Sequence, residues 1–247
     1  MPTILITGCS SGFGLETARL FLERGWHVVA TMRTPRHDLL PANERLRVLA
    51  LDVGDAASIR AAVDAAGTVD VLVNNAGIGV LNPLEATAPA TVREVFDTNT
   101  LGTIALTQAV LPQMRARRSG VVVNVTSSVT LRALPLLSVY TASKAAVNAF
   151  TESLALELEP LGVRTRLVLP GRSPETQFGA NARVRMQDGA PDDYAPVVQG
   201  VFAGMGAPGP VTHALDVAQA VWRAATDPAA PMRIPAGADA EAWAAAG

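Results

Sequence analysis

A tyrosine and a lysine four residues apart have the types and the spacing for proton-transfer chemistry. The 247-residue chain carries 20 lysine and arginine side chains, of which only Lys144 is a lysine, and Tyr140 is one of two tyrosines. Lysine offers a compact charge with a tunable pKa, whereas arginine is a permanently charged planar fork. A single lysine in a chain otherwise supplied with arginine suggests a task that arginine cannot perform.

Residues four apart lie on one face if the segment is helical. An ammonium group beside a phenol favours the phenolate, so we expect Lys144 to lower the pKa of Tyr140 from its usual value of about 10. Tyr140 would then serve as a proton donor and acceptor near neutral pH. The pair by itself is also compatible with a surface lysine that follows a buried tyrosine.

A glycine-rich stretch near the N-terminus has the composition of an anion-binding turn. The aliphatic run 3–7 is followed by Gly8–Gly14 (GCSSGFG), and a helical pattern starts at once. A helix N-terminus offers free N–H groups and the positive end of the helix dipole, and glycines let the backbone approach a phosphate. The spacing differs from the more common Gly-x-Gly-x-x-Gly fingerprint. Its place in the first βαβ unit favours dinucleotide binding over a plain tight turn.

Short aliphatic runs alternate with amphipathic stretches of helix length along the chain. Runs that are apolar on both faces, such as 71–73 and 121–123, are typical of buried parallel strands. Their alternation with helices indicates βαβ units. We therefore predict an α/β fold with a single doubly wound parallel sheet of the Rossmann type, about seven strands wide and flanked by helices on both faces. The expected strands are 3–7, 27–31, 47–51, 69–73, 121–126, 164–169 and 232–235, and the expected helices are 12–24, 56–66, 91–117, 138–158 and 215–226.

Composition and charge narrow the class of protein. Apolar residues make up 49% of the chain and aromatic residues only 4%, which fits one domain over residues 1–247 with an aliphatic core. A net charge of -2 gives no electrostatic reason to expect nucleic acid or an anionic membrane as a partner. Apolar runs fall short of the ~20 residues needed to span a bilayer. Cys9 is the only cysteine, which excludes an intrachain disulfide and favours a reducing, cytoplasmic location. We expect no metal site.

Three motifs stand at the ends of expected elements, and two smaller marks accompany them. The motifs are Thr7-Gly8-x-x-x-Gly12-x-Gly14, Asn74-Asn75-Ala76-Gly77 and Tyr140-x-x-x-Lys144, and the marks are Leu51-Asp52-Val53 and Pro170-Gly171. In type and order they resemble the signatures of the short-chain dehydrogenase/reductase family. The resemblance extends over nearly the whole chain and weakens only after Gly171 and at the C-terminal end.

The resemblance implies that a hydride passes between a nicotinamide and a ketone or secondary alcohol while Tyr140 exchanges a proton with the substrate oxygen. It implies that Lys144 lowers the pKa of Tyr140 and binds the nicotinamide ribose. The family also uses a serine about thirteen residues before the tyrosine to hold the substrate carbonyl. Counting back gives Ser127, whose hydroxyl can stabilise developing oxyanion charge; in a strand, Thr126 and Ser128 point to the other face. A serine that caps a turn is the alternative.

Asn99 lies within the expected helix 91–117. It resembles the family's asparagine, which distorts this helix and holds a water that relays protons to the lysine. A solvent-facing asparagine, a poor helix former, is the alternative.

The end of the second expected strand bears on the choice of cofactor. An NAD-preferring site usually has an acid there, but this chain has Met32 followed by Arg33. Arginine can pair with the 2′-phosphate of NADP, so we expect NADP(H) to be preferred, with NAD(H) as the alternative. In the alternative, Arg33 is only solvated, and Asp38 reaches back to bind the ribose of NAD(H).

The resemblance assigns further cofactor contacts. It implies that Asp52 lies by the adenine amino group, that Asn74 braces the central strands and that Gly77 gives the cofactor room. The expected cofactor-binding residues are Gly8, Ser10, Ser11, Gly12, Phe13, Gly14, Arg33, Asp52, Val53, Asn75, Ala76, Gly77, Tyr140, Lys144, Pro170 and Gly171.

Residues 171–212 form the one long irregular region, rich in glycine, proline and alanine, and we expect them to cover the substrate. Thr176 lies six residues after Pro170, whereas the family often has a threonine five residues after this proline, so the sequence leaves open whether Thr176 contacts the nicotinamide. The apolar residues of this region either line a pocket for an apolar ketone or alcohol or anchor the segment to the core. They are Phe178, Met186, Tyr194, Phe202 and Met205.

The leading hypothesis is an NADP(H)-dependent carbonyl reductase or alcohol dehydrogenase for small molecules. The resemblance suggests a homodimer or homotetramer packed through the helices 91–117 and 138–158. One alternative is a β-ketoacyl reductase whose acidic acyl carrier would bind Arg115, Arg117 and Arg118, although the helix dipole also favours cations there. The other is a dinucleotide-binding regulator without activity, which we would expect to lack part of the catalytic set.

Overall fold

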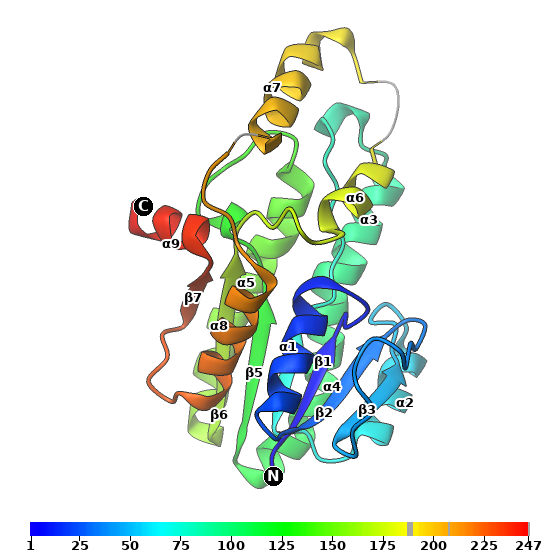
Figure 1. Cartoon of the computed structure of the whole chain (residues 1–247), viewed down its shortest axis with the longest axis vertical. Helices are drawn as coiled ribbons and strands as arrows, with labels where there is room; N and C mark the ends of the chain where they lie inside the picture. The colour runs from blue at the N-terminus through cyan, green and yellow to red at the C-terminus, as the bar shows by residue number, and fades with distance from the viewer. Residues whose placement is uncertain (187–189, 207, 247) are drawn as a thin grey trace.

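A seven-stranded parallel sheet forms the centre of the computed structural model, which describes residues 1–186, 190–206 and 208–246 (Figure 1). The strand order is β3-β2-β1-β4-β5-β6-β7. Strands β2 and β3 are added on one side of β1 and strands β4 to β7 on the other, so the strand order reverses between β1 and β4. Ligands of open α/β sheets bind outside the carboxyl ends of the strands at such a point. The predicted fold class is confirmed, with strand bounds within two residues of those expected. The strands are β1 Thr3–Thr7, β2 His27–Met32, β3 Leu46–Ala50, β4 Val71–Asn74, β5 Gly120–Val125, β6 Val163–Pro170 and β7 Arg233–Ala236.

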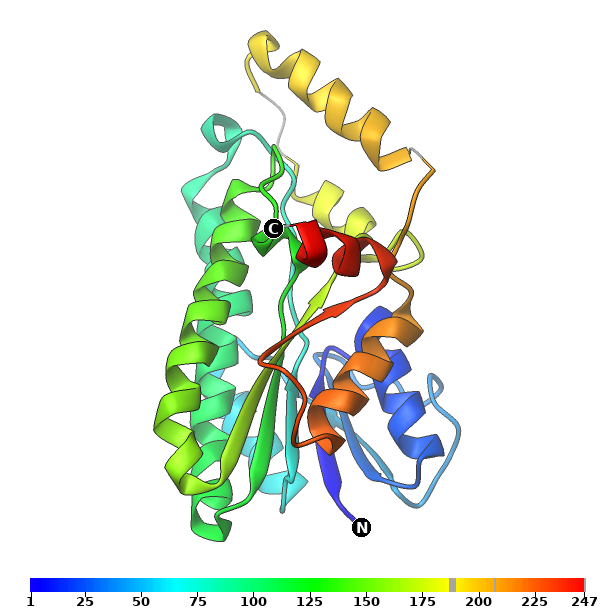
Figure 2. The ribbon, with the colours of Figure 1, turned by 90° about the vertical axis from the view of Figure 1, so that its left-hand side faces the viewer.

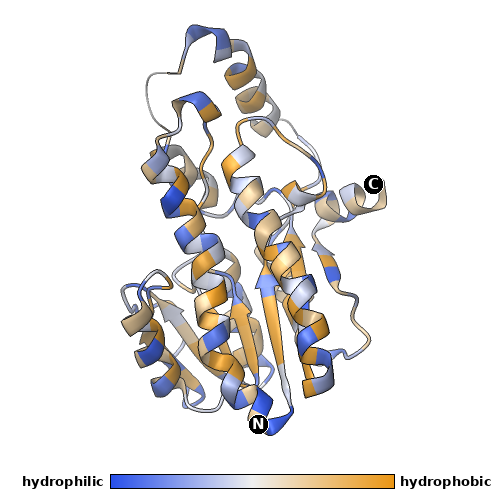
Figure 3. Cartoon of the chain, turned by 180° about the vertical axis from the view of Figure 1, so that it is seen from behind, coloured by the Kyte–Doolittle hydropathy of each residue, from blue (hydrophilic) through white to orange (hydrophobic). Residues whose placement is uncertain are grey.

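Helices cover both faces of the sheet (Figure 2). Successive residues of a strand point to opposite faces, and in β1 Ile4 and Ile6 pack with α1 and α8, while Leu5 packs with α2, α4 and α5. Figure 3 shows the strands as mostly hydrophobic ribbons between helices of mixed hydropathy. None of the helices in the described residues is both long and apolar enough to cross a membrane. These covering helices are α1 Gly12–Glu23, α2 Ala56–Ala66, α4 Gly102–Arg117, α5 Ser138–Leu158 and α8 Ala214–Thr226.

The expected continuous helix 91–117 is instead three segments. Helix α3, Pro89–Phe96, leads into a π-helical turn, Asp97–Leu101, and α4 continues from Gly102. A π-turn inserts one extra residue into an α-helical repeat and is frequent at functional sites. The apolar periodicity on both sides hides this insertion, which is why the sequence predicted one helix.

The described part of the expected irregular region 171–212 contains two α-helices. They are α6, Phe178–Val184, and α7, Ala195–Gly206. Figure 1 shows α7 standing above the carboxyl ends of the strands, away from the sheet. A last helix, α9 Ala238–Ala246, follows β7.

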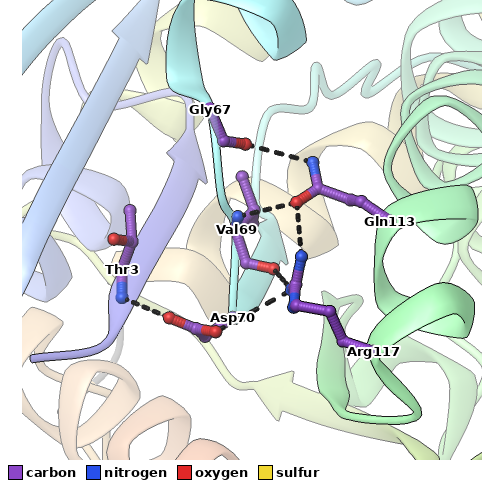
Figure 4. A network of polar contacts seen from close by, with 6 residues as sticks. All are labelled: Thr3, Gly67, Val69, Asp70, Gln113 and Arg117. Atoms are coloured by element: carbon purple, nitrogen blue, oxygen red, sulfur yellow. Dashed lines mark hydrogen bonds and ion pairs between the residues drawn. The ribbon is translucent and has the colours of Figure 1, made fainter.

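A polar network fixes the opposite, amino ends of β1 and β4 (Figure 4). Thr3 donates its N–H to Asp70 at 2.8 Å, and Arg117 of α4 donates to the Val69 carbonyl at 2.7 Å. Gln113 accepts from the Val69 N–H at 2.9 Å and from Arg117 at 2.9 Å. The end of α4 is thereby tied to the strand that follows α2.

Candidate active site

Tyr140 and Lys144 lie on the first turns of α5, and both are buried, with 6% and 5% of their surfaces exposed. The Lys144 ammonium donates to the Val125 carbonyl at 3.1 Å. The Ser127 hydroxyl interacts with Tyr140 and opposes part of the effect of burial on its pKa. Ser127 follows β5 and also accepts the Val129 N–H at 3.3 Å, so it caps a short turn as well. The alternative of a surface lysine is excluded.

The predicted lowering of the Tyr140 pKa is wrong for this structure. Burial raises the pKa of Tyr140 to about 12, and the hydrogen bond with Ser127 opposes that rise only in part. Burial also lowers the pKa of Lys144 to about 8. Removing either side chain from water penalises its charged form, and the Lys144 ammonium is directed to a backbone carbonyl. Burial therefore favours the neutral phenol of Tyr140 and the neutral amine of Lys144 over their charged forms.

Asn99 lies in the π-turn and is fully buried, which excludes a solvent-facing side chain. Its amide oxygen accepts the Ile78 N–H at 2.8 Å, and its amide nitrogen donates to the Ile78 carbonyl at 2.9 Å. The same nitrogen donates to the Ser143 hydroxyl at 3.0 Å, and Ser143 donates to the Tyr140 carbonyl at 2.7 Å. Asn99 thereby connects the loop after β4 to the first turn of α5.

Gly77 lies beside this group and is exposed. A Cβ atom at Gly77 would lie 3.1 Å from the Asn99 amide oxygen and 3.2 Å from the Lys144 ammonium. The structure therefore brings Asn99, Lys144 and the Asn74–Gly77 motif together, as expected. A side chain at position 77 would therefore press against both the Asn99 amide and the Lys144 ammonium.

The glycine turn after β1 is shaped by backbone requirements. Gly8 and Gly12 have positive φ angles of 74° and 55°, which non-glycine residues rarely adopt. A Cβ atom at Gly14 would lie 2.5 Å from the Gly8 carbonyl oxygen, so α1 packs directly on the turn. Ser11 is the N-cap of α1, makes no side-chain capping bond and is exposed like Ser10, whereas Phe13 packs against the core.

The motif after β4 is bound to the end of β1. Asn75 donates its side-chain amide to the Thr7 carbonyl at 2.8 Å, and the Thr7 hydroxyl accepts the N–H groups of Asn75 and Ala76, both at 2.9 Å. The carboxyl ends of these two strands form the point where the strand order reverses. The glycine turn after β1 and the Asn74–Gly77 motif after β4 are therefore held side by side by hydrogen bonds.

Asn74 braces the central strands, as expected, but through partners that the sequence analysis missed. Its amide donates to Asn124 at 2.8 Å and to Thr107 at 3.0 Å. Asn124 in turn donates to Thr151 of α5 at 2.7 Å. The available signal was Asn124 itself, a polar residue inside the apolar run 121–125, because a buried amide requires partners.

Arg33 is exposed directly after β2, and it makes no ion pair within the described residues. Arg36 instead pairs with Asp38 at 2.7 Å, so Asp38 is already engaged by a cation. Met32 is buried. At the end of β3, Asp52 accepts the Gly54 N–H at 2.9 Å, and Val53 packs beneath Gly102 of α4.

The first part of 171–212 lies over the predicted site. Thr176 is close to the glycine turn: a Cβ atom at Gly12 would lie 3.3 Å from its methyl group. The Phe178 ring lies 5.2 Å from the Tyr140 ring. The Tyr194 hydroxyl bonds to Glu85 at 3.1 Å, while Met186, Phe202 and Met205 are partly buried.

Asp239 is a buried carboxylate that the sequence analysis missed. It accepts the Arg172 N–H at 2.6 Å and the Thr212 hydroxyl at 2.7 Å, and a Cβ atom at Gly171 would lie 2.2 Å from its oxygens. Both ends of 171–212 therefore meet at the start of α9, directly after Pro170. No sequence pattern linked these residues, because they are far apart in the chain.

The residues at the carboxyl ends of β1 and β4 fit a dinucleotide. Gly8 and Gly12 keep side chains away from the free N-terminus of α1, where a phosphate would bind. Gly77 leaves space beside Lys144, and Arg33 is available for a phosphate at the ribose. A hollow of about 670 Å³ between α8, β7 and α9 is lined by none of the predicted site residues.

Residues 2–186 match the sequence profile of the family described as short chain dehydrogenase. The chain belongs to the short-chain dehydrogenase/reductase family. It is 38% identical over 196 residues to 3-ketodihydrosphingosine reductase of Bacteroides thetaiotaomicron, covering 78% of this chain and 71% of that protein. It is 42% identical over 180 residues to human retinol dehydrogenase 8, covering 68% of this chain and 58% of that protein, less than two thirds of its length.

Solved structures of the family have the same fold. A short-chain dehydrogenase from Streptomyces avermitilis superposes with a TM-score of 0.86 and 32% identity, over 99% of this chain and 91% of that chain. A serine dehydrogenase in complex with NADP+ superposes with a TM-score of 0.81 and 27% identity, over 96% of this chain and 95% of that one. This short-chain dehydrogenase/reductase is thus an oxidoreductase with a fold that binds a nicotinamide dinucleotide.

Proposed function

We propose that this enzyme transfers a hydride between NADP(H) and a ketone or secondary alcohol, with Tyr140 as the acid and base. The observation that carries the proposal is the buried group at the carboxyl end of β5, in which Ser127 interacts with Tyr140, Lys144 bonds to Val125 and Asn99 bonds to Ser143. Two neighbouring hydroxyl groups there can both turn to one carbonyl oxygen. These four side chains are the catalytic residues of the proposal.

The nicotinamide, when bound, supplies or accepts the hydride at the substrate carbon. Ser127 and Tyr140 hold the substrate oxygen and stabilise the negative charge that develops on it. In reduction, Tyr140 donates its proton to this oxygen and becomes a phenolate. A buried phenol with a raised pKa is neutral at pH 7 and therefore carries the proton that reduction needs.

Lys144 and Asn99 act on Tyr140 and the cofactor side of the site. The Lys144 ammonium stabilises a phenolate once it forms, and the space at Gly77 lets it reach a ribose hydroxyl. Asn99 fixes the first turn of α5 through Ser143. The remaining cofactor contacts of the proposal are those of the two motif loops, Arg33, Asp52, Val53, Pro170 and Gly171.

Two lines of support favour an apolar ketone or alcohol. Phe178 covers Tyr140 with an apolar ring. The names of two relatives, 3-ketodihydrosphingosine reductase and retinol dehydrogenase 8, refer to a ketone and to an alcohol.

In the proposal, residues 1–247 act as one cytoplasmic domain, and 171–212 cover the substrate. Copies of the chain pack as a homodimer or homotetramer through α4 and α5. The exposed side chains of Leu101, next to α4, and Leu156 of α5 support this contact, with 55% and 75% of their surfaces accessible.

The alternative of a β-ketoacyl reductase is supported by likeness to a Brucella melitensis 3-ketoacyl-(acyl-carrier-protein) reductase, with a TM-score of 0.78 and 27% identity. The predicted carrier contacts do not favour it. Arg117 bonds at the amino end of β4, and Arg118 donates to the Pro160 carbonyl at 2.7 Å. Both lie at the opposite end of the strands from Tyr140. The buried set of Asn99, Ser127, Tyr140 and Lys144 argues against a regulator without activity.

A panel of ketones assayed by NADPH absorbance tests the proposed function. The wild-type enzyme is expected to consume NADPH with at least one ketone, and Tyr140→Phe is expected to slow this reaction by ~100-fold or more. A Tyr140→Phe variant with unchanged turnover would refute the assignment of Tyr140.

A further inference from the structure

Phe178, the first residue of α6, lies across the ring of Tyr140. The two ring centroids are 5.2 Å apart with planes inclined by 55°, a favourable aromatic contact. Phe178 nevertheless keeps 38% of its surface exposed, while Tyr140 is buried. The outer face of Phe178 is therefore open above the residue proposed to react.

The position of this ring depends on a glycine. A Cβ atom at Gly79 would lie 2.6 Å and 3.0 Å from the outer carbon atoms of Phe178, and 3.2 Å from the methyl group of Ala182. Gly79 does not have a positive φ angle. Its missing side chain is thus needed for the close approach of α6 rather than for backbone conformation.

The segment around Phe178 is held on both sides. Before it, Thr176 lies against Gly12, and its hydroxyl donates to the Ser173 carbonyl at 2.9 Å. After it, Arg185 donates to Glu94 of α3 at 2.9 Å. These contacts fix α6 against the body of the molecule, so the Phe178 ring has a defined place.

We propose that Phe178, seated on Gly79, is the specificity-determining residue of this enzyme and selects ketones and alcohols whose carbon next to the reacting centre carries an apolar group. The inference rests on the proposed function and names the substrate class of the same site. A substrate that reaches the Tyr140 hydroxyl must place its neighbouring group against the Phe178 ring. An apolar group is buried there favourably, whereas a hydroxyl group loses its bonds to water and finds no partner on the ring.

Two small ketones separate these cases. Benzylacetone presents an apolar group beside its carbonyl, and hydroxyacetone presents a hydroxyl group. Phe178→Ala is expected to lower kcat/KM for benzylacetone by ~10-fold or more and to leave kcat/KM for hydroxyacetone nearly unchanged. Val184→Ala, on the same helix but 84% exposed, is the matched control and should change neither value. Equal losses for both ketones, or none, would overturn the inference.

Gly79→Ala tests whether the close contact between Gly79 and the Phe178 ring sets the position of that ring. Alone, it is expected to reproduce the selective loss for benzylacetone, because its methyl group displaces Phe178. In the Phe178→Ala background the same substitution has no ring to displace, so it should add little further loss. Such non-additivity is the mark of two residues in contact. Additive losses would show that Gly79 acts through the backbone and would contradict the proposal.

A readout without turnover separates failure of this inference from failure of the proposed function. In a Tyr194→Phe background, Tyr140 is the only tyrosine, so its ionisation is followed by absorbance, with near-ultraviolet circular dichroism to verify folding. Phe178→Ala should lower the pKa of Tyr140 from about 12 towards the value of a free phenol. If no ketone of the panel is reduced, the proposed function fails, whereas an unchanged titration curve overturns the contact between Phe178 and Tyr140.

Discussion

Burial acts on Tyr140 and Lys144 in opposite senses, raising the pKa of the phenol and lowering that of the ammonium. The types and spacing of the two residues were sufficient to predict that both lie on one helix. The direction of the Tyr140 shift was not predictable, because desolvation depends on what covers the ring, and Phe178 and Ser127 come from other segments. Motif residues were thus predictable one by one, whereas their electrostatics required the packing.

Arg33 is expected to discriminate between the two nicotinamide cofactors. Arg33→Ala should raise the Michaelis constant for NADPH by ~10-fold or more, because a charge-assisted hydrogen bond to the 2′-phosphate is lost. The constant for NADH should change little. Arg36→Ala is the matched control, since Arg36 already pairs with Asp38. Equal rises for both cofactors in steady-state assays would remove Arg33 from this role.

Among the elements, the strands and the covering helices could be predicted from apolar periodicity. The segments that build the site could not, because they depart from that periodicity. The π-turn at Asn99 adds one residue to a periodic pattern, and α6 and α7 are rich in alanine and glycine, with no clear amphipathic face. The anchoring of 171–212 by Asp239 joins residues distant in sequence. Such long-range contacts have no local signal.

Asp239→Asn tests this anchoring. The amide nitrogen cannot accept either the Arg172 N–H or the Thr212 hydroxyl, so one buried hydrogen bond is lost at a cost of about 1–3 kcal/mol. Hydrogen exchange measured by mass spectrometry should become faster at 171–176 and 208–213 together. Asp216→Asn, at a half-buried carboxylate that accepts the His213 N–H, should affect only the start of α8. Unchanged exchange at 171–176 in Asp239→Asn would contradict the anchoring.

At the scale of the whole molecule, alternating strands and helices were enough to predict the sheet, since buried parallel strands are apolar on both faces. The sequence could not show how much stability the site costs. Lys144 has an ordinary pKa of 10.5 and a folded pKa of about 8. The unfolded chain therefore binds a proton more readily between these values, and burying the cation costs on the order of 3 kcal/mol below pH 8.

This cost predicts a pH dependence of stability. As pH rises from 8 towards 10, the folded state has already lost the Lys144 proton while the unfolded chain still holds it, so the contribution of Lys144 to the free energy of unfolding increases. In denaturant unfolding, the free energy of unfolding of Lys144→Met should increase less between pH 8 and 10 than that of the wild type. Above pH 10 the unfolded chain loses the Tyr140 proton while the folded state keeps it, because the folded pKa of Tyr140 is raised to about 12. The free energy of unfolding therefore falls again. Parallel curves for the two proteins between pH 8 and 10 would contradict the burial cost.

Isotope transfer follows the proposed hydride from cofactor to product. NADPH that carries two deuterium atoms on the reactive carbon of its nicotinamide is incubated with benzylacetone, and the alcohol product is analysed by mass spectrometry. We expect deuterium on the carbinol carbon with the wild-type enzyme and a rate lower by ~100-fold or more with Tyr140→Phe. Alcohol without deuterium would rule out hydride transfer from the nicotinamide, and equal rates for the two proteins would rule out Tyr140 as the acid.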